Sequence, residues 1–269
     1  DVSVAQFAKV KLRVRSEQLM RGLGRHLLLR ALYGLQKVGA SMMADFYVRP
    51  GHEPKIPESI SQQLHQILTP GDVLVVRKEY ALTNYFLPGH WPHAALYLGD
   101  RQSLVKLAAN WQATIVPRWV EMMRENATSS EANAGSQKHV LESMKDGVQV
   151  RPLISPLSSD SLVVLRPQIA PELISKALLR GLVHEGKPYD FDFDFRRSDR
   201  LVCTEVIYRA YEGIGDISFP LEYRAGRLTL SGGDLIQMAV KREHFDPIVV
   251  FAPWQSNGLL SGNDADHVL

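Results

Sequence analysis

The chain has 269 residues, of which 45% are hydrophobic and 22% are charged, and this composition is typical of a folded globular protein. Lys and Arg number 31 against 29 Asp and Glu, so the net charge of +2 gives no reason to expect nucleic acid as a partner. The single cysteine, Cys203, excludes an intrachain disulfide and a zinc site made of several thiolates.

Residues 1–65 are predicted to form a helical N-terminal extension, because apolar side chains recur near helical spacing over residues 27–43. Residues 9–30 are rich in Lys and Arg, which fits either a solvated helix face or contact with an anionic membrane surface. No apolar run approaches the roughly 18 to 20 residues that span a bilayer. The chain begins at Asp1 rather than methionine, so we expect a start or an export signal to have been removed, and both bacterial cytoplasm and periplasm stay open.

The next 190 residues or so, 66–255, alternate between strand-like and helix-like patterns. Short apolar runs bounded by turn residues predict strands at 72–76, 93–98, 140–153, 161–166, 189–195, 228–230 and 248–251. Helical spacing predicts helices at 170–185, 201–212 and 235–240. Residues 101–138 lack either pattern and are predicted to be an insertion with a mobile loop, and residues 256–269 a polar tail.

Cys203 lies at the start of the predicted helix 201–212. The N-terminus of a helix stabilises a thiolate through its unpaired N–H groups and the positive end of its dipole. This position favours a nucleophile. A buried, inert thiol is the alternative, because Leu201, Val202 and Val206 around it are apolar.

His93 opens the predicted strand 93–98, from which its ring can face a helix docked on the sheet and act as a base. A solvent-facing turn histidine is the alternative, since the chain has 9 histidines. Glu142, in the strand before the turn Lys145-Asp146-Gly147, is the candidate to orient the imidazole, and an exposed strand carboxylate is its alternative.

Several short motifs then occur in a characteristic order. They are Pro70-Gly71-Asp72-Val73-Leu74, Pro92-His93-Ala94-Ala95-Leu96-Tyr97-Leu98-Gly99, Leu141-Glu142 with Asp146-Gly147-Val148, Tyr189-Asp190-Phe191 and Val202-Cys203-Thr204-Glu205. In this order they resemble the circularly permuted papain-like hydrolases of the NlpC/P60 superfamily, the YiiX-like group. The resemblance covers residues 66–212 best and extends more weakly to Pro253.

The resemblance implies an α+β fold, with a permuted papain-like (NlpC/P60-type) domain over residues 66–255 whose nucleophile helix packs on an antiparallel sheet. It implies Cys203 as nucleophile, His93 as base and Glu142 as the orienting residue. The expected enzyme is a cysteine hydrolase that cleaves an amide bond in a peptide or cell-wall-type peptide through a thioacyl intermediate, without a cofactor or metal. The backbone N–H of Cys203, with Tyr85 as a second donor, is expected to bind the oxyanion.

Two other functions stay open at this point: a thiol acyltransferase or hydrolase acting on lipid acyl groups, and a non-catalytic binding module with a papain-like cleft. A zinc site would need His90, His93 and Glu142, but Pro92 argues against a helix that would align the two histidines. Alternating Asp190, Asp192 and Asp194 resemble a calcium loop only superficially, because the glycine and glutamate of such a loop are missing, and a strand with one acidic face is the better interpretation.

Overall fold

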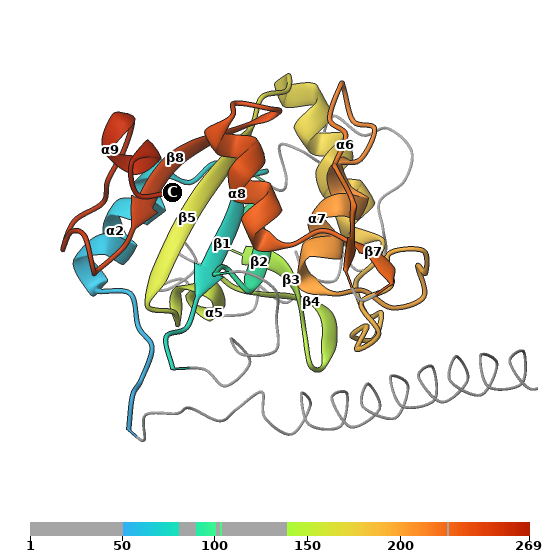
Figure 1. The fold of residues 1–269 in the computed structure, drawn as a ribbon, viewed down its shortest axis with the longest axis horizontal. Coiled ribbons are helices and arrows are strands. Elements are labelled where there is room, and N and C mark those ends of the chain that lie inside the picture. The colour runs from blue at the N-terminus through green and yellow to red at the C-terminus, as the bar shows by residue number, and fades with distance from the viewer. Residues whose placement is uncertain (1–50, 81–89, 101–102, 104–138, 225) are drawn as a thin grey trace, which may run out of the picture. The chain divides into compact units, whose positions relative to one another are not determined.

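A six-stranded antiparallel sheet organises the part of the chain that the structure describes (Figure 1). The structure is a computed structural model, and it describes residues 51–80, 90–100, 103, 139–224 and 226–269. The strand order in the sheet is β4-β3-β2-β1-β5-β8. The strands are β1 (Val73–Arg77), β2 (His93–Gly99), β3 (His139–Met144), β4 (Gly147–Pro152), β5 (Ser161–Pro167) and β8 (Phe245–Phe251). The α+β class with an antiparallel sheet is therefore confirmed.

Helices cover both faces of this sheet. They are α2 (Glu58–Ile67), α5 (Ile154–Leu157), α6 (Pro171–Leu182), α7 (Cys203–Tyr211), α8 (Gly232–Val240) and α9 (Asn263–Asp266). Because side chains alternate along a strand, Val73 and Val75 of β1 join one apolar cluster with α6, α7 and α8. Leu74 and Val76 join a second cluster with α2 and α5. Each face of the sheet thus has its own core, and α7 belongs to the larger of the two.

Two smaller features complete the described fold. A hairpin of β6 (Glu222–Arg224) and β7 (Arg227–Thr229) lies outside the main sheet, before α8. The segment predicted as a polar tail, 256–269, pairs Leu260 with Val250 and buries Ala265 of α9 in the larger core. The predicted boundary at residue 65 falls inside α2, whose Ile60 and Leu64 are buried in the smaller core.

Most of the predicted strands and helices occur close to their expected positions. The prediction of a strand over residues 189–195 is wrong. Among the residues that the structure describes, this segment makes one isolated bridge, between Tyr189 and Leu201, and joins no strand ladder. Asp190 is buried, and its carboxylate accepts hydrogen bonds from the backbone N–H groups of Asp192 (2.9 Å) and Asp194 (2.8 Å). An Asp side chain that satisfies backbone donors in this way stabilises a turn rather than a strand, so there is no acidic strand face.

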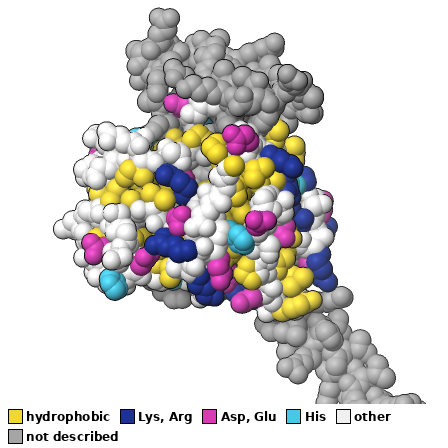
Figure 2. All heavy atoms as spheres, turned by 90° about the horizontal axis from the view of Figure 1, so that it is seen from above, with side chains coloured by type: hydrophobic (Ala, Val, Ile, Leu, Met, Phe, Trp, Pro, Cys, Tyr) yellow, Lys and Arg dark blue, Asp and Glu magenta, His cyan; other side chains and the backbone are white. Residues whose placement is uncertain are grey.

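The face shown in Figure 2 carries basic and acidic side chains side by side. Among the ion pairs of the described residues, Arg242 pairs with both Asp246 and Asp266, at 3.5 and 2.8 Å. The described helices include none that is both long and apolar enough to cross a membrane. The predicted N-terminal helices up to residue 50, Tyr85 and almost all of the insertion 101–138 lie outside the described residues.

Candidate active site

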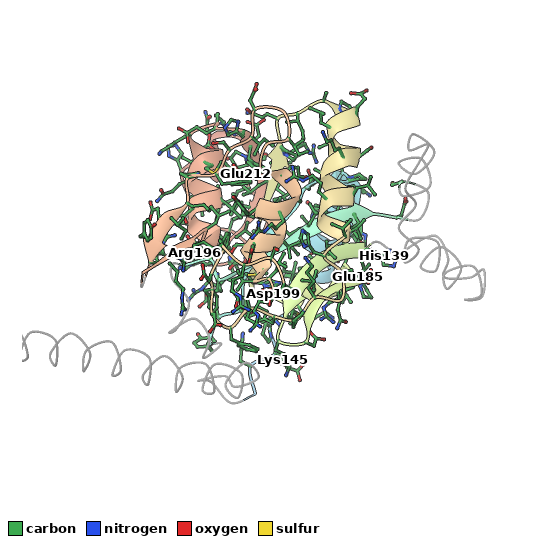
Figure 3. All side chains as sticks on the ribbon, turned by 90° about the vertical axis from the view of Figure 1, so that its right-hand side faces the viewer. His139, Lys145, Glu185, Arg196, Asp199 and Glu212 are labelled. Carbon is green, nitrogen blue, oxygen red and sulfur yellow. The ribbon has the colours of Figure 1, made fainter. Side chains whose placement is uncertain are left out.

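Cys203 is the first residue of α7 and is only 6% exposed. The helix forms because Val206, Ile207 and Ala210 recur on one side and are fully buried against the sheet. It begins after the extended residue Val202 and has no side-chain cap. The backbone N–H of Cys203 is therefore one of the helix's orphan donors, and the thiol sits at the positive end of the helix dipole. Asp199 lies near this end of α7 and Glu212 at the other, as Figure 3 shows.

His93 is the first residue of β2 and lies between Cys203 and a carboxylate. Its Nε2 is 2.6 Å from Oε2 of Glu142. Its side chain also hydrogen-bonds Cys203, and since Nε2 faces Glu142, this bond falls to Nδ1. In its thiol form Cys203 can instead donate its single proton to the carbonyl oxygen of Pro92, 3.7 Å from Sγ. The structure thus brings the predicted thiol and imidazole into direct contact.

Glu142 is buried in β3, with 1% of its side chain exposed. Its Oε1 accepts a hydrogen bond from the hydroxyl of Ser155 in α5 and lies 3.5 Å from Nε of Arg151 in β4. A buried carboxylate needs such partners to remain charged. Burial alone would raise the pKa of Glu142, but His93, Ser155 and Arg151 together hold it below its usual value. Glu142 is therefore an anion that faces His93, and not an exposed strand carboxylate.

Burial opposes the charged forms of His93 and Cys203, but their attraction for each other outweighs it. Burial lowers the pKa of His93, whereas hydrogen bonds and opposite charge from Cys203 and Glu142 raise it, with a net result of about 10. Burial raises the pKa of the Cys203 thiol, whereas His93 and the backbone N–H groups of Ala94 and Thr204 lower it to below its usual value. These shifts favour the pair as a thiolate beside an imidazolium, with Glu142 behind it.

A thiolate, an acid–base group and a third group that orients it are the parts needed for attack on an acyl carbon. The family model of permuted papain-like amidase enzymes, the YaeF/YiiX or C92 family, matches residues 67–252. The chain belongs to this family. Membership of the C92 family makes it a papain-like cysteine amidase, and it confirms the permuted papain-like fold expected from the order of the motifs.

One solved structure similar to this C92 chain is that of metalloprotein YiiX from Escherichia coli O157:H7. The two are 15% identical, with a TM-score of 0.41, and the match covers 73% of this chain and 97% of the other. No curated protein matches the chain.

Tyr85 and His90 are also expected from the sequence to contribute to a site. Tyr85, the expected second oxyanion donor, lies outside the described residues. His90 is exposed and stacks edge-on against Trp91 and Trp254, with ring centroids at 5.2 and 5.5 Å. Within the described ranges no group of three or more His, Cys, Asp or Glu residues is placed to hold a metal ion, and the zinc hypothesis with His90 finds no support there.

Sequence reasoning missed the residues that hold Glu142. A signal for Arg151 did exist, because the turn after Met144 sets a hairpin in which Glu142 pairs with Gln149, and Val140 with Arg151. Alternate residues of a strand lie on one face of the sheet, and so do residues that pair across two strands. Arg151 therefore lies on the same face as Glu142. Ser155 belongs to α5, a helix of four residues, which is too short for a periodic pattern in the sequence to predict it.

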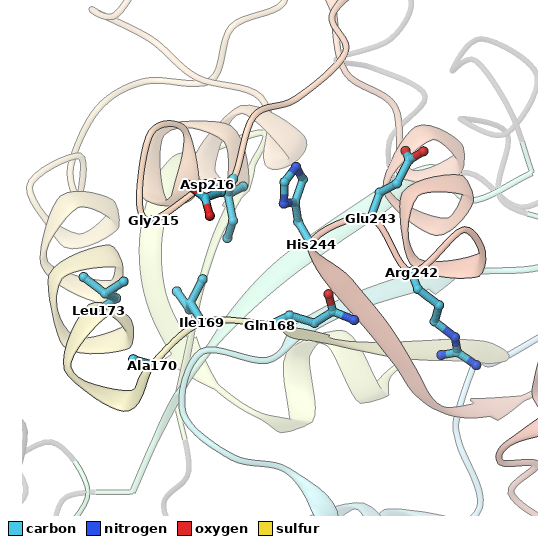
Figure 4. Close-up of a pocket in the computed structure, with 10 residues that line it drawn as sticks. Gln168, Ile169, Ala170, Leu173, Gly215, Asp216, Arg242, Glu243 and His244 are labelled. Carbon is cyan, nitrogen blue, oxygen red and sulfur yellow. The ribbon is translucent and has the colours of Figure 1, made fainter.

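A separate hollow lies at the opposite end of β5 from this centre, lined by Gln168, Ile169, Ala170, Leu173, Gly215, Asp216, Ile217, Arg242, Glu243 and His244 (Figure 4). Gln168 comes directly after the last residue of β5. Ser161, the first residue of β5, pairs with Arg77, which is the neighbour of the residue that pairs with His93. None of Cys203, His93 and Glu142 lines this hollow.

Proposed function

We propose that this C92 amidase hydrolyses an amide bond of a peptide or cell-wall-type peptide through a thioacyl-enzyme, with Cys203 as nucleophile. The observation that carries the proposal is the line of contacts from Cys203 through His93 to the buried carboxylate of Glu142. In this line His93 is the general acid and base, and Glu142 holds its ring in place.

The thiolate of Cys203 attacks the acyl carbon, and a C–S bond forms as the carbonyl electrons move to oxygen. The backbone N–H of Cys203, open at the start of α7, donates to this oxyanion, and Tyr85 remains the proposed second donor. As the tetrahedral intermediate collapses, the C–N bond breaks and His93 gives its proton to the leaving amine. A thioacyl-enzyme and a neutral imidazole remain.

Water completes the cycle. His93 takes a proton from a water molecule, whose oxygen attacks the thioacyl carbon. The C–S bond breaks, the carboxylic acid leaves, and Cys203 returns to thiolate beside the protonated His93. The negative carboxylate of Glu142 favours the protonated ring at both ends of the cycle, because it lies 2.6 Å from Nε2.

The test is the rate at which iodoacetamide alkylates Cys203 as a function of pH, followed by mass spectrometry. Only the thiolate reacts, so the wild type should label rapidly well below pH 8, down to the lowered pKa of Cys203. In His93→Ala the pKa of Cys203 should rise, because the imidazolium that lowers it is gone, and labelling at about pH 6.5 should fall at least about tenfold.

His244→Ala is the matched control, since His244 lines the hollow at the opposite end of β5 from Cys203. It should keep the wild-type profile. Amide substrates are then screened with the wild type and Cys203→Ala. Slow labelling of the wild type near neutral pH, or unchanged labelling of His93→Ala, would overturn the proposal.

A further inference from the structure

Three aromatic rings gather at the edge of the Cys203 centre. The rings of His90 and Trp91 are 5.2 Å apart, those of His90 and Trp254 5.5 Å, and those of Trp91 and Trp254 6.3 Å. We propose that this trio, called here the aromatic shelf, binds an apolar group attached next to the scissile carbonyl of the substrate. The inference rests on the proposed function, because it names the substrate class of the same site.

The sheet register places the shelf beside the nucleophile. His93 pairs with Val76, Val76 with Leu162 and Leu162 with Phe251, so the start of β2 and the end of β8 lie at one end of the sheet. Trp254 follows Phe251 by three residues. Two strands that are not neighbours in the sheet therefore deliver their aromatic residues to the end where His93 stands.

The chain itself connects the shelf to the thiol. Trp91 precedes Pro92, whose carbonyl oxygen is 3.7 Å from Sγ of Cys203. The Cα atoms of Trp91 and His93 are separated by at most about 7 Å, the length of two extended residues. A side chain or acyl substituent one residue away from the scissile carbonyl can therefore reach the shelf while the carbonyl carbon lies at Sγ.

The base of the shelf is held in place by the surrounding backbone. Trp91 is 7% exposed, and its carbonyl packs so closely on Gly232 that a Cβ there would lie 2.3 Å from the oxygen. The carbonyl of His90 accepts a hydrogen bond of 2.7 Å from Arg77. A surface that is ordered before binding loses little entropy when a ligand arrives.

Trp254 gives the shelf its open surface. It is 50% exposed, although Ala252, two residues earlier, is fully buried. Burial and the charge of Arg77 lower the pKa of His90, against the opposing effect of Glu79, so its ring is neutral at neutral pH. Aromatic rings without a charge bind apolar or flat groups best. An aromatic side chain and an aliphatic acyl chain are both apolar, so either can bind to the shelf.

The test compares three thiol reagents on the full chain: iodoacetamide, N-benzyl iodoacetamide and N-octyl iodoacetamide. Each rate constant is divided by that for glutathione, which corrects for intrinsic reactivity. The wild type should favour the apolar reagents over iodoacetamide, and Trp254→Ala should reduce that preference, taken as the ratio of the normalised rates, by roughly fivefold. Trp254→Phe should retain most of the preference, and Tyr223→Ala, at another exposed aromatic residue, should retain all of it. A larger preference for the benzyl reagent points to an aromatic side chain, and one for the octyl reagent to a lipid acyl chain.

Equal normalised rates for all reagents on the wild type, or a preference that survives Trp254→Ala, would overturn the shelf while leaving the proposed function intact. Failure of the proposed function shows separately, as slow reaction with iodoacetamide itself. In that case binding of N-benzylacetamide to Cys203→Ala, measured by calorimetry, still decides the inference. Tighter binding than that of acetamide, lost in the Cys203→Ala, Trp254→Ala double variant, supports the shelf, and equal binding refutes it.

Discussion

Nε2 of His93 and Oε2 of Glu142 lie 2.6 Å apart, although 49 residues separate them in the chain. Antiparallel pairing of β2 with β3, in which Leu96 faces Leu141, brings the two strands into register for this contact. Because one ring nitrogen faces the carboxylate, the other is left for Cys203. The orientation of the ring beside the thiol is thus set by a carboxylate of the neighbouring strand.

Replacing Glu142 with Gln should uncouple the thiolate pair without removing the side chain's volume. His93 has a raised pKa partly because of the Glu142 charge, so losing that charge lowers the pKa of His93. A less protonated His93 then stabilises the Cys203 thiolate less, and the pKa of Cys203 rises. Iodoacetamide labelling should fall by about tenfold or more at about pH 6.5 and change little at about pH 9.

Asp146→Asn is the control for this variant. Arg151 lies near Glu142 and also pairs with Asp146, whose Oδ1 is 2.5 Å from the guanidinium. The side chain of Asp146 is 49% exposed. Its loss should leave the labelling profile where it is. A Glu142→Gln profile that coincides with the wild type would show that the carboxylate does not tune the pair.

Removing the hydroxyl of Ser155 should weaken the support of Glu142 rather than abolish reactivity. Ser155 donates to Oε1 of Glu142, which is buried, and a hydrogen bond to a charged group contributes about 1.5–3 kcal/mol. Ser155→Ala should lower the free energy of unfolding by about that amount in urea titrations, and raise the pH at which labelling begins.

Ser158→Ala is a matched control, because Ser158 caps the same short helix with an exposed bond of 2.8 Å to the carbonyl of Ile154. It should cost less stability and leave the pH of labelling unchanged. If both variants shift that pH equally, the effect comes from α5 as a whole and not from the bond to Glu142.

Gly232→Ala should disturb the base of the aromatic shelf. A Cβ at Gly232 would lie 2.3 Å from the backbone oxygen of Trp91, and a backbone atom cannot rotate away as a flexible side chain can. Overpacking of this kind costs about 1–3 kcal/mol, which a thermal melt detects as a drop of several degrees. Gly233→Ala is the control, because its nearest neighbour would be Oγ of Ser231 at 3.6 Å, and it should be neutral or slightly stabilising. Equal melting temperatures for the two variants would contradict the close approach of α8 to Trp91.

The main strands and the helix α7 could be predicted because their residues carry a single, consistent pattern. In β2 an unbroken run of apolar residues leads from His93 to Gly99, and in α7 the apolar positions repeat at helical spacing up to Tyr211. Cys203 and His93 could be paired because the chain has one cysteine and because the motif order resembled a family whose model indeed matches.

The remainder depends on contacts between residues far apart in the chain, which no local pattern encodes. Acidic and aromatic residues alternate over 189–195 as in a strand. The buried carboxylate of Asp190, however, accepts hydrogen bonds from two backbone N–H groups of this segment, and these bonds stabilise a turn. Trp254 follows the predicted strand 248–251 with no hint in the sequence that it reaches His90. Side chains that act across the sheet become visible only when the strand order is known.

Glu205 offers a prediction on stability. It is fully buried in the first turn of α7, its Oε1 accepts from Arg209 at 2.7 Å, and its Oε2 has no hydrogen-bond partner among the described residues. Burial raises its pKa, Arg209 counteracts this, and the nearby charge of Asp190 adds to it, with a net value of about 7. Glu205 therefore carries a proton in the folded chain at a pH where the unfolded chain has lost it.

A carboxyl group whose pKa is raised by folding makes the folded state bind more protons than the unfolded state. Stability from this group is then fully present below the unfolded pKa of about 4.3, falls as pH rises, and is lost above the folded pKa of about 7. Over that window the wild type should lose on the order of 4 kcal/mol relative to Glu205→Gln, whose amide does not titrate.

Both proteins are compared in a Cys203→Ala background, so that ionisation of the thiol does not contribute, and their melting temperatures are recorded between about pH 4.5 and 7.5. If Glu205 is already ionised over this whole range, the difference in stability between the parent and the Glu205→Gln variant does not change with pH. A difference in stability that is independent of pH would therefore contradict a buried, protonated carboxyl at Glu205. Glu222→Gln is the control, because Glu222 is 63% exposed and pairs with Arg224. Its difference from the parent should stay nearly constant with pH, because an exposed ion pair contributes little to the stability of the folded chain.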